Sequence, residues 1–80
     1  MNINILFFGI TSDFVGKSKV SYTINQKSTV KNLKKEITNL YPNLSNIKEF
    51  AIAVNEEYAH DDLILNDGDV VAIIPPVSGG

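Results

Sequence analysis

The sequence contains no cysteine among its 80 residues. The chain therefore has no disulfide, no thiolate ligand for a metal and no thiol nucleophile, and any sulfur it handles must come from elsewhere. A positive charge excess is also missing, because seven basic and nine acidic residues give a net charge of −2. Without a broad positive field to attract a phosphate backbone, we exclude nucleic acids as partners.

Long hydrophobic runs are absent as well. The N-terminal apolar run Ile5–Phe8 is too short for a signal peptide, and no basic residue precedes it. Nothing in the sequence approaches the roughly 20 apolar residues that a membrane span requires. We therefore expect a cytoplasmic protein without a membrane partner.

The residues that are present are typical of one small folded domain. The apolar fraction of 44% is ordinary for a globular protein. A chain of this length buries roughly 60–65% of its unfolded surface, which allows one modest core. We predict a single domain over residues 1–76, followed by a flexible tail at residues 77–80.

Alternating apolar residues predict several short strands. Both faces of the first strand are apolar at its end, whereas the second alternates apolar and polar residues. Residues 9–19, which contain two glycines, are predicted to form a loop between them. The predicted strands cover residues 3–8, 20–25, 50–54, 63–65 and 70–74.

One amphipathic helix is predicted between the second and third strands. Ser28 or Thr29 is suited to cap its N-terminus. Pro42 ends it, because proline bars the α conformation at the preceding residue and supplies no amide hydrogen. The apolar positions that recur at helical spacing are Val30, Leu33, Ile37 and Leu40.

This order of elements predicts an α+β fold of the β-grasp type. In that fold the first and last strands lie side by side in the centre of a four- to five-stranded mixed sheet. A single helix covers only one face of such a sheet, so the apolar side chains on the other face must meet a partner or stay exposed. We place Leu6, Phe8 and Ile74 on that uncovered face.

The C-terminus combines a stiff approach with a flexible tip. Pro75 and Pro76 hold an extended path, and Gly79 and Gly80 let the backbone enter a narrow cleft. Two terminal glycines alone are also compatible with an ordinary frayed end. Because the root of this tail belongs to a central strand, we interpret Gly80 as a carboxylate presented to the active site of another enzyme.

The segment from Asp67 to Gly80 resembles the C-terminal signature of the MoaD-type sulfur carriers, the small subunits of molybdopterin synthase. Leu6-Phe7-Phe8 and Ala53-Val54-Asn55 resemble two other segments common in that family. The resemblance spans the chain in order, and its PPVSGG ending is highly specific. Members of this family have a ubiquitin-like β-grasp fold.

The resemblance implies a carrier cycle centred on Gly80. An adenylating enzyme of the ubiquitin-activating type would use ATP and Mg to form a glycyl adenylate, and a sulfur donor would convert it to a thiocarboxylate (1-thioglycine). The thiocarboxylate would give its sulfur to cyclic pyranopterin monophosphate and so build the molybdopterin dithiolene. The chain itself would bind no cofactor and no metal, and the large subunit would supply catalysis.

The resemblance also implies partners and contact residues. Two small and two large subunits would form a heterotetramer, with the tail threaded into partner active sites. The threading residues would be Val77, Ser78, Gly79 and Gly80. The interface residues would be Leu6, Phe8, Ile74, Pro75 and Pro76.

One segment departs from the family pattern. Many relatives carry an arginine shortly after the first strand, whereas Thr11-Ser12-Asp13 contains none. A polar contact to the large subunit would then be lost, or Lys17 would supply it.

Other functions remain open at this stage. A sulfur carrier for thiazole synthesis shares the fold and the two glycines, although Pro75-Pro76-Val77-Ser78 argues against it. A ubiquitin-like modifier would instead join Gly80 to a lysine of a target protein. The chain could also be an interaction domain whose tail is incidental, in which case removing Gly80 would change nothing.

The remaining charged residues have simpler explanations. His60 beside Asp61 and Asp62 suggests a metal site, but an exposed turn explains these residues better. Two acidic pairs are interpreted as turn residues on a solvated edge rather than as acid–base groups, and three lysines as a solvated helix face rather than a patch that steers an acidic partner. These residues are Glu56 and Glu57, Asp67 and Asp69, and Lys31, Lys34 and Lys35.

Overall fold

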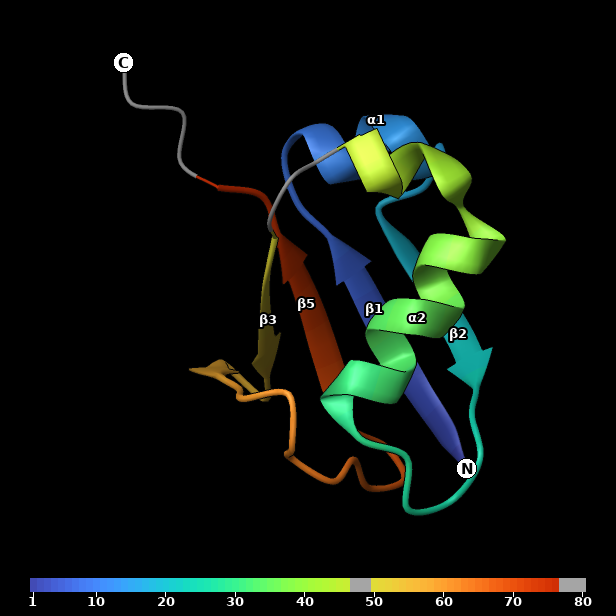
Figure 1. The fold of residues 1–80 in the computed structure, drawn as a ribbon, viewed down its shortest axis with the longest axis vertical. Helices are drawn as coiled ribbons and strands as arrows, with labels where there is room; N and C mark the ends of the chain where they lie inside the picture. The colour runs from blue at the N-terminus through green and yellow to red at the C-terminus, as the bar shows by residue number, and fades with distance from the viewer. Residues whose placement is uncertain (47–49, 77–80) are drawn as a thin grey trace.

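A computed structural model describes residues 1–46 and 50–76 of the chain (Figure 1). The predictions for the tail, residues 77–80, therefore lie outside the described residues. The elements in chain order are β1 (Asn2–Phe7), α1 (Ile10–Val15), β2 (Lys19–Thr23), α2 (Val30–Leu40), a 3-10 helix η1 (Pro42–Asn46), β3 (Ala51–Val54), β4 (Glu57–Tyr58) and β5 (Val70–Ile74).

The strands form one mixed sheet in the order β2-β1-β5-β3-β4. The first and last strands, β1 and β5, pair in parallel at its centre, with Ile5 opposite Val71. The other neighbouring strands pair antiparallel. Figure 1 shows α2 lying across one face of this sheet. The predicted β-grasp arrangement is therefore confirmed.

The core lies between α2 and the sheet. Inward side chains of β1, β3 and β5 meet the apolar stripe of α2, and each large side chain buried in this way contributes roughly 1.5–3 kcal/mol. Phe7 packs edge-on against Tyr41, with ring centroids 5.9 Å apart. The most buried of these core side chains are Ile3, Ile5, Val30, Leu33, Ile37, Leu44, Val71 and Ile73.

Thr29, rather than Ser28, caps helix α2. The Thr29 hydroxyl accepts the Asn32 N–H at 3.2 Å, and the Asn32 side-chain oxygen accepts the Thr29 N–H at 2.9 Å. This reciprocal pair satisfies two amide groups that the first helical turn leaves free. The helix ends at Leu40, and Pro42 opens η1, which contributes the buried Leu44.

The loop predicted over residues 9–19 is wrong, because α1 lies inside it. The Thr11 N–H donates to the Phe8 carbonyl, and the Ser12 N–H donates to the Gly9 carbonyl, both at 3.1 Å. Gly16 then ends the helix in the left-handed conformation, with its N–H on the Ser12 carbonyl at 2.8 Å. Six helical residues are too few to show a hydrophobic period.

The strand predicted at residues 63–65 is also wrong. This segment lies beside the start of α2, where the Val30 N–H donates to the Leu63 carbonyl at 3.0 Å and the Leu65 N–H donates to the Ser28 carbonyl at 2.8 Å. It therefore satisfies the Val30 N–H at the helix N-terminus and forms only an isolated bridge, between Ile64 and Thr29, rather than extending the sheet.

The fifth strand is β4 instead, reached from β3 by a tight turn. Asn55 and Glu56 both have positive φ, 51° and 72°. Two left-handed residues are typical of a two-residue hairpin turn, which usually contains glycine. Because a glutamate occupies the second position, the sequence carries no strong hairpin signal.

Tyr22 links strand β2 to helix α2 and gives the fold a measurable pH dependence. Its hydroxyl donates to the Glu36 carboxylate at 2.7 Å. Burial, followed by this hydrogen bond and the charge of Glu36, raises the pKa of Tyr22 from 10.0 to about 12. The unfolded chain releases this proton at the lower pH, so stability falls as the pH rises from 10 towards 12.

We expect Tyr22→Phe to remove this loss of stability above pH 10. At neutral pH the variant should be less stable by about 1 kcal/mol, the usual contribution of one hydrogen bond. Urea unfolding of both proteins from pH 7 to 12 measures the effect. Parallel stability curves for the two proteins over this range would contradict the prediction.

Candidate functional site: an uncovered sheet face beside the tail root

The sheet face opposite α2 carries exposed apolar side chains. Because Phe7 and Ile73 point into the core, alternation along the strands turns Leu6, Phe8 and Ile74 outward. The structure thus places these three on the face to which the sequence analysis assigned them. Phe8 remains 48% exposed.

Three alanines occupy the centre of this face. Ala72 on β5 is opposite Leu6 on one side and Ala53 on the other, and Ala51 is opposite Ile74. Their small side chains lie between the larger groups of β1 and of β4. Ala51 and Ala72 are partly exposed, whereas Ala53 is only 6% exposed and is therefore covered by its neighbours.

Tyr58 belongs to the same face, and the sequence analysis missed it. It pairs with Ala53 across the β3–β4 hairpin, which turns its ring to the outward side, and it is 76% exposed. The only sequence signal was its place three residues after the turn residue Asn55. We call the set Leu6, Phe8, Tyr58 and Ile74, with Ala51, Ala53 and Ala72, the docking face.

The root of the C-terminal tail adjoins the docking face. Strand β5 ends at Ile74, Pro75 is partly buried, and Pro76 is exposed. The proposed reacting residue Gly80 and the threading residues 77–79 lie outside the described residues.

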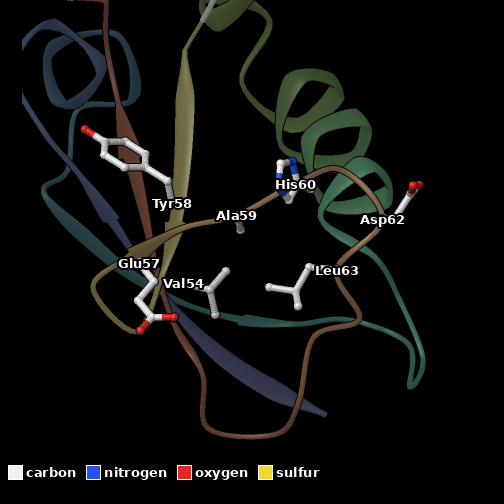
Figure 2. A pocket seen from close by; sticks show the side chains of 7 residues that line it. All are labelled: Val54, Glu57, Tyr58, Ala59, His60, Asp62 and Leu63. Carbon is white, nitrogen blue, oxygen red and sulfur yellow. The ribbon is translucent and has the colours of Figure 1, made fainter.

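A pocket of about 460 Å³ lies next to β4 (Figure 2). Its polar side chains include Glu57, His60 and Asp62, and its apolar walls include Val54 and Leu63. The described residues, 1–46 and 50–76, hold no group of three His, Cys, Asp or Glu side chains that could bind a metal ion.

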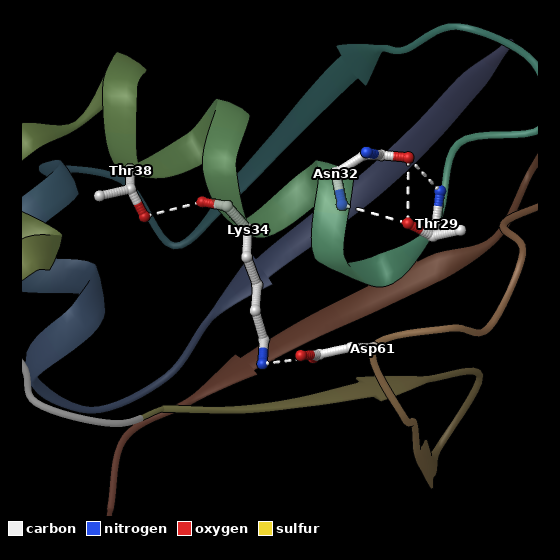
Figure 3. Close-up of polar contacts among 5 residues, drawn as sticks. All are labelled: Thr29, Asn32, Lys34, Thr38 and Asp61. Carbon is white, nitrogen blue, oxygen red and sulfur yellow. Dashed lines mark hydrogen bonds and ion pairs between the residues drawn. The ribbon is translucent and has the colours of Figure 1, made fainter.

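Asp61 is not part of this pocket, because it pairs with Lys34. Its carboxylate accepts a hydrogen bond from the Lys34 Nζ at 2.7 Å (Figure 3). That bond, followed by the lysine's charge, lowers the pKa of Asp61. The trio His60, Asp61 and Asp62 therefore does not converge, and Lys34 contributes a paired charge to the basic face of α2.

The acidic residues near the last turn anchor the backbone. Asp67 accepts the Asn2 N–H at 2.8 Å, so it holds the start of β1. Asp69 accepts the Asn66 N–H at 2.8 Å and the Asn55 side-chain amide at 3.0 Å. Asp69 is only 8% exposed, which corrects the prediction that it lies on a solvated edge. Glu56 and Glu57 are exposed at the hairpin, as predicted.

Within the described part of the chain, no helix is long and apolar enough to cross a bilayer.

Comparison with known proteins gives consistent matches over the whole chain. Residues 5–80 match the model of the ThiS family. The molybdopterin synthase sulfur carrier subunit of Dictyostelium discoideum is 38% identical over 80 residues, which cover 95% of this chain and 93% of that protein.

Two solved structures resemble this chain over its whole length. SAMP1 from Haloferax volcanii has a TM-score of 0.88 at 22% identity, with 100% of both chains covered, which shows a shared fold. A chain in the protein–protein complex of subunits 1 and 2 of the molybdopterin-converting factor from Helicobacter pylori 26695 has a TM-score of 0.72 at 27% identity, again with 100% of both chains covered.

Proposed function

Because the chain belongs to the ThiS family, we propose that it is the sulfur carrier subunit of a molybdopterin synthase. The observation that carries this proposal is the 38% identity, over nearly the full length, to a protein of that name. The PPVSGG ending of the sequence agrees with it.

The reacting group in this proposal is the α-carboxylate of Gly80. A carboxylate is a poor acyl donor, so an adenylating partner first joins it to AMP and releases pyrophosphate from ATP. A donor then supplies sulfur at the oxidation level of sulfide, which attacks the carbonyl carbon and displaces AMP. The resulting thiocarboxylate is an anion whose sulfur is a better nucleophile than the original oxygen. We assign ATP and Mg to the adenylating enzyme and none to this chain.

The docking face supplies the contact with the large subunit in this proposal. A sheet face with exposed Phe8 and Tyr58 and small central alanines is suited to burial against another protein. The Helicobacter pylori relative is solved in a complex of subunits 1 and 2. We propose the same kind of pairing here, with two small and two large subunits, and place the cycle in the cytoplasm.

The tail reaches the partner's active site from one end of this contact. Pro75 and Pro76 continue directly from β5, the central strand that carries Ile74 on the docking face. A partner bound to the face would therefore meet the chain end next to it. In this arrangement one surface provides affinity and residues 77–80 provide the chemistry.

The proposal is tested by loading the chain with sulfur. The full chain, ATP, an adenylating enzyme and a sulfur donor are mixed, and the intact mass is measured. We expect a shift of one oxygen-to-sulfur exchange, followed by loss of that sulfur when the large subunit and cyclic pyranopterin monophosphate are added.

Other outcomes would identify a different function. Covalent adducts on lysines of other proteins would indicate a modifier. Sulfur transfer to a thiazole-forming enzyme, without transfer to the large subunit, would indicate the thiazole pathway. No mass change, under conditions where a known carrier is converted, would contradict the sulfur carrier assignment.

A further inference from the structure

We infer that Gly9 is a positioning residue for the reacting C-terminus, because its missing side chain leaves the space that the Pro75 ring occupies. Gly9 lies between β1 and α1, far from Pro75 in sequence. The inference rests on the proposed function, since it concerns how the tail leaves the sheet towards a partner's active site.

The backbone at Gly9 has a conformation that side chains disfavour. Its φ is 55° and its ψ is −135°, a combination reached almost only by glycine. Ser12 of α1 stabilises this backbone conformation, because its N–H and its hydroxyl both donate to the Gly9 carbonyl, at 3.1 and 2.8 Å. The position is therefore fixed rather than free to adapt.

A side chain at this position would press on Pro75. A Cβ added to Gly9 would lie 3.1 Å from the Pro75 Cγ and 3.8 Å from its Cδ. The usual separation of carbon atoms in contact is about 3.5–4.0 Å. One of the two residues would have to move by a few tenths of an ångström.

The movement of a proline ring changes the direction of the chain. Its ring includes the backbone nitrogen and holds φ near −65°, so Cδ moves with the main chain, whereas Cγ can also shift by a change of ring pucker. An ordinary side chain in the place of Pro75 could rotate away without moving the backbone. The contact with Gly9 therefore limits the positions open to the Pro75 ring and, through Cδ, the path of the tail root.

No hydrogen bond from its own amide can hold Pro75 in place. Where β1 and β5 end, the last hydrogen bond between them is donated by the Phe8 N–H to the Ile73 carbonyl, at 3.1 Å. The fully buried Thr11 stabilises the same end of the two strands, because its hydroxyl donates a hydrogen bond to the Phe8 carbonyl at 2.5 Å. Beyond it proline has no N–H to donate, so packing on Gly9 takes over.

The reaction should be sensitive to this direction. A misplacement of about 1 Å can cost 10²-fold in rate when reacting atoms must approach closely. For a shift of a few tenths of an ångström at the tail root we expect about a three- to tenfold loss. The loss should appear in the rate of adenylation at saturating carrier, with the affinity of the docking face unchanged.

The test compares Gly9→Ala with Gly68→Ala. Both glycines have positive φ, 55° and 85°, but a Cβ at Gly68 meets nothing within 4 Å. Both variants therefore carry backbone strain, and only the first presses on the tail root. We expect kcat for adenylation to fall in Gly9→Ala and to stay at the native value in Gly68→Ala.

A second background isolates the contact and does not depend on the stability of Gly9→Ala alone. Pro75→Ala removes the two ring atoms that the new methyl group would meet. In that background the additional effect of Gly9→Ala on kcat should disappear. An equal loss in both backgrounds, or in Gly68→Ala, would overturn the inference.

A spectroscopic measurement separates failure of this inference from failure of the proposed function. In the native chain, NMR should detect a nuclear Overhauser effect between the Gly9 Hα and the Pro75 ring protons. If that contact is missing while the native chain is still converted to a thiocarboxylate, the inference fails and the function stands. If the native chain is not converted at all, the function fails and the role of Gly9 in the reaction fails with it.

Discussion

Deletion of Gly80 is expected to abolish formation of the thiocarboxylate, and extension of the chain by one residue is expected to do the same. Either change moves the carboxylate by about 3.5 Å along an extended chain. Reacting atoms must come within about 3–3.5 Å of each other, so this displacement is as large as the approach itself. Neither change touches the docking face, and binding to the large subunit should therefore survive.

Mass spectrometry of the intact protein after incubation with ATP, the adenylating enzyme and a sulfur donor measures this effect. The control is the extended chain after a protease has removed the added residue, which restores the Gly80 carboxylate without refolding the protein. Conversion should return in that sample. A thiocarboxylate on the shortened chain would contradict the role of Gly80.

Phe8→Asp is expected to weaken binding to the large subunit by at least about tenfold. Burial of a phenylalanine contributes roughly 1.5–3 kcal/mol, and every 1.4 kcal/mol changes a dissociation constant about tenfold. Burial of an unpaired carboxylate adds a desolvation cost in the same direction. The fold should persist, because Phe8 is already 48% exposed in the free chain.

Leu40→Asp is the matched control for this prediction. Leu40 is 53% exposed and lies on α2, which covers the opposite face of the sheet. The same type of substitution at similar exposure should leave the affinity for the large subunit unchanged. Titration calorimetry with the isolated large subunit measures both variants. An unchanged affinity of Phe8→Asp would show that the partner binds elsewhere.

The sequence alone determined the features whose signals are local. The signals for α2 are its apolar spacing, a cap at Ser28 or Thr29 and the stop at Pro42. They are local, and the structure places the helix at Val30–Leu40 with Thr29 as the cap. The central strands are also local signals, because their continuous apolar runs are typical of strands buried between neighbours. The PPVSGG motif at the C-terminus, which resembles the sulfur carrier family, is likewise recognisable from the sequence alone.

Tertiary structure decided the parts that depend on contacts between distant residues. The identity of the fifth strand depended on such contacts. Residues 63–65 bond to the backbone at the start of α2, and Glu57–Tyr58 pair with the edge of β3. Asp69 became buried because Asn55 and the Asn66 amide converge on its carboxylate.

The composition of the functional surface was decided in the same way. Tyr58 on β4 joins Phe8 at the end of β1 on the docking face only because β3 and β5 connect these two strands in one sheet. Gly9 meets Pro75 only because the ends of β1 and β5 lie side by side. Local sequence patterns specify what a segment can form, whereas the packing of segments that are remote in the chain specifies which side chains share a surface.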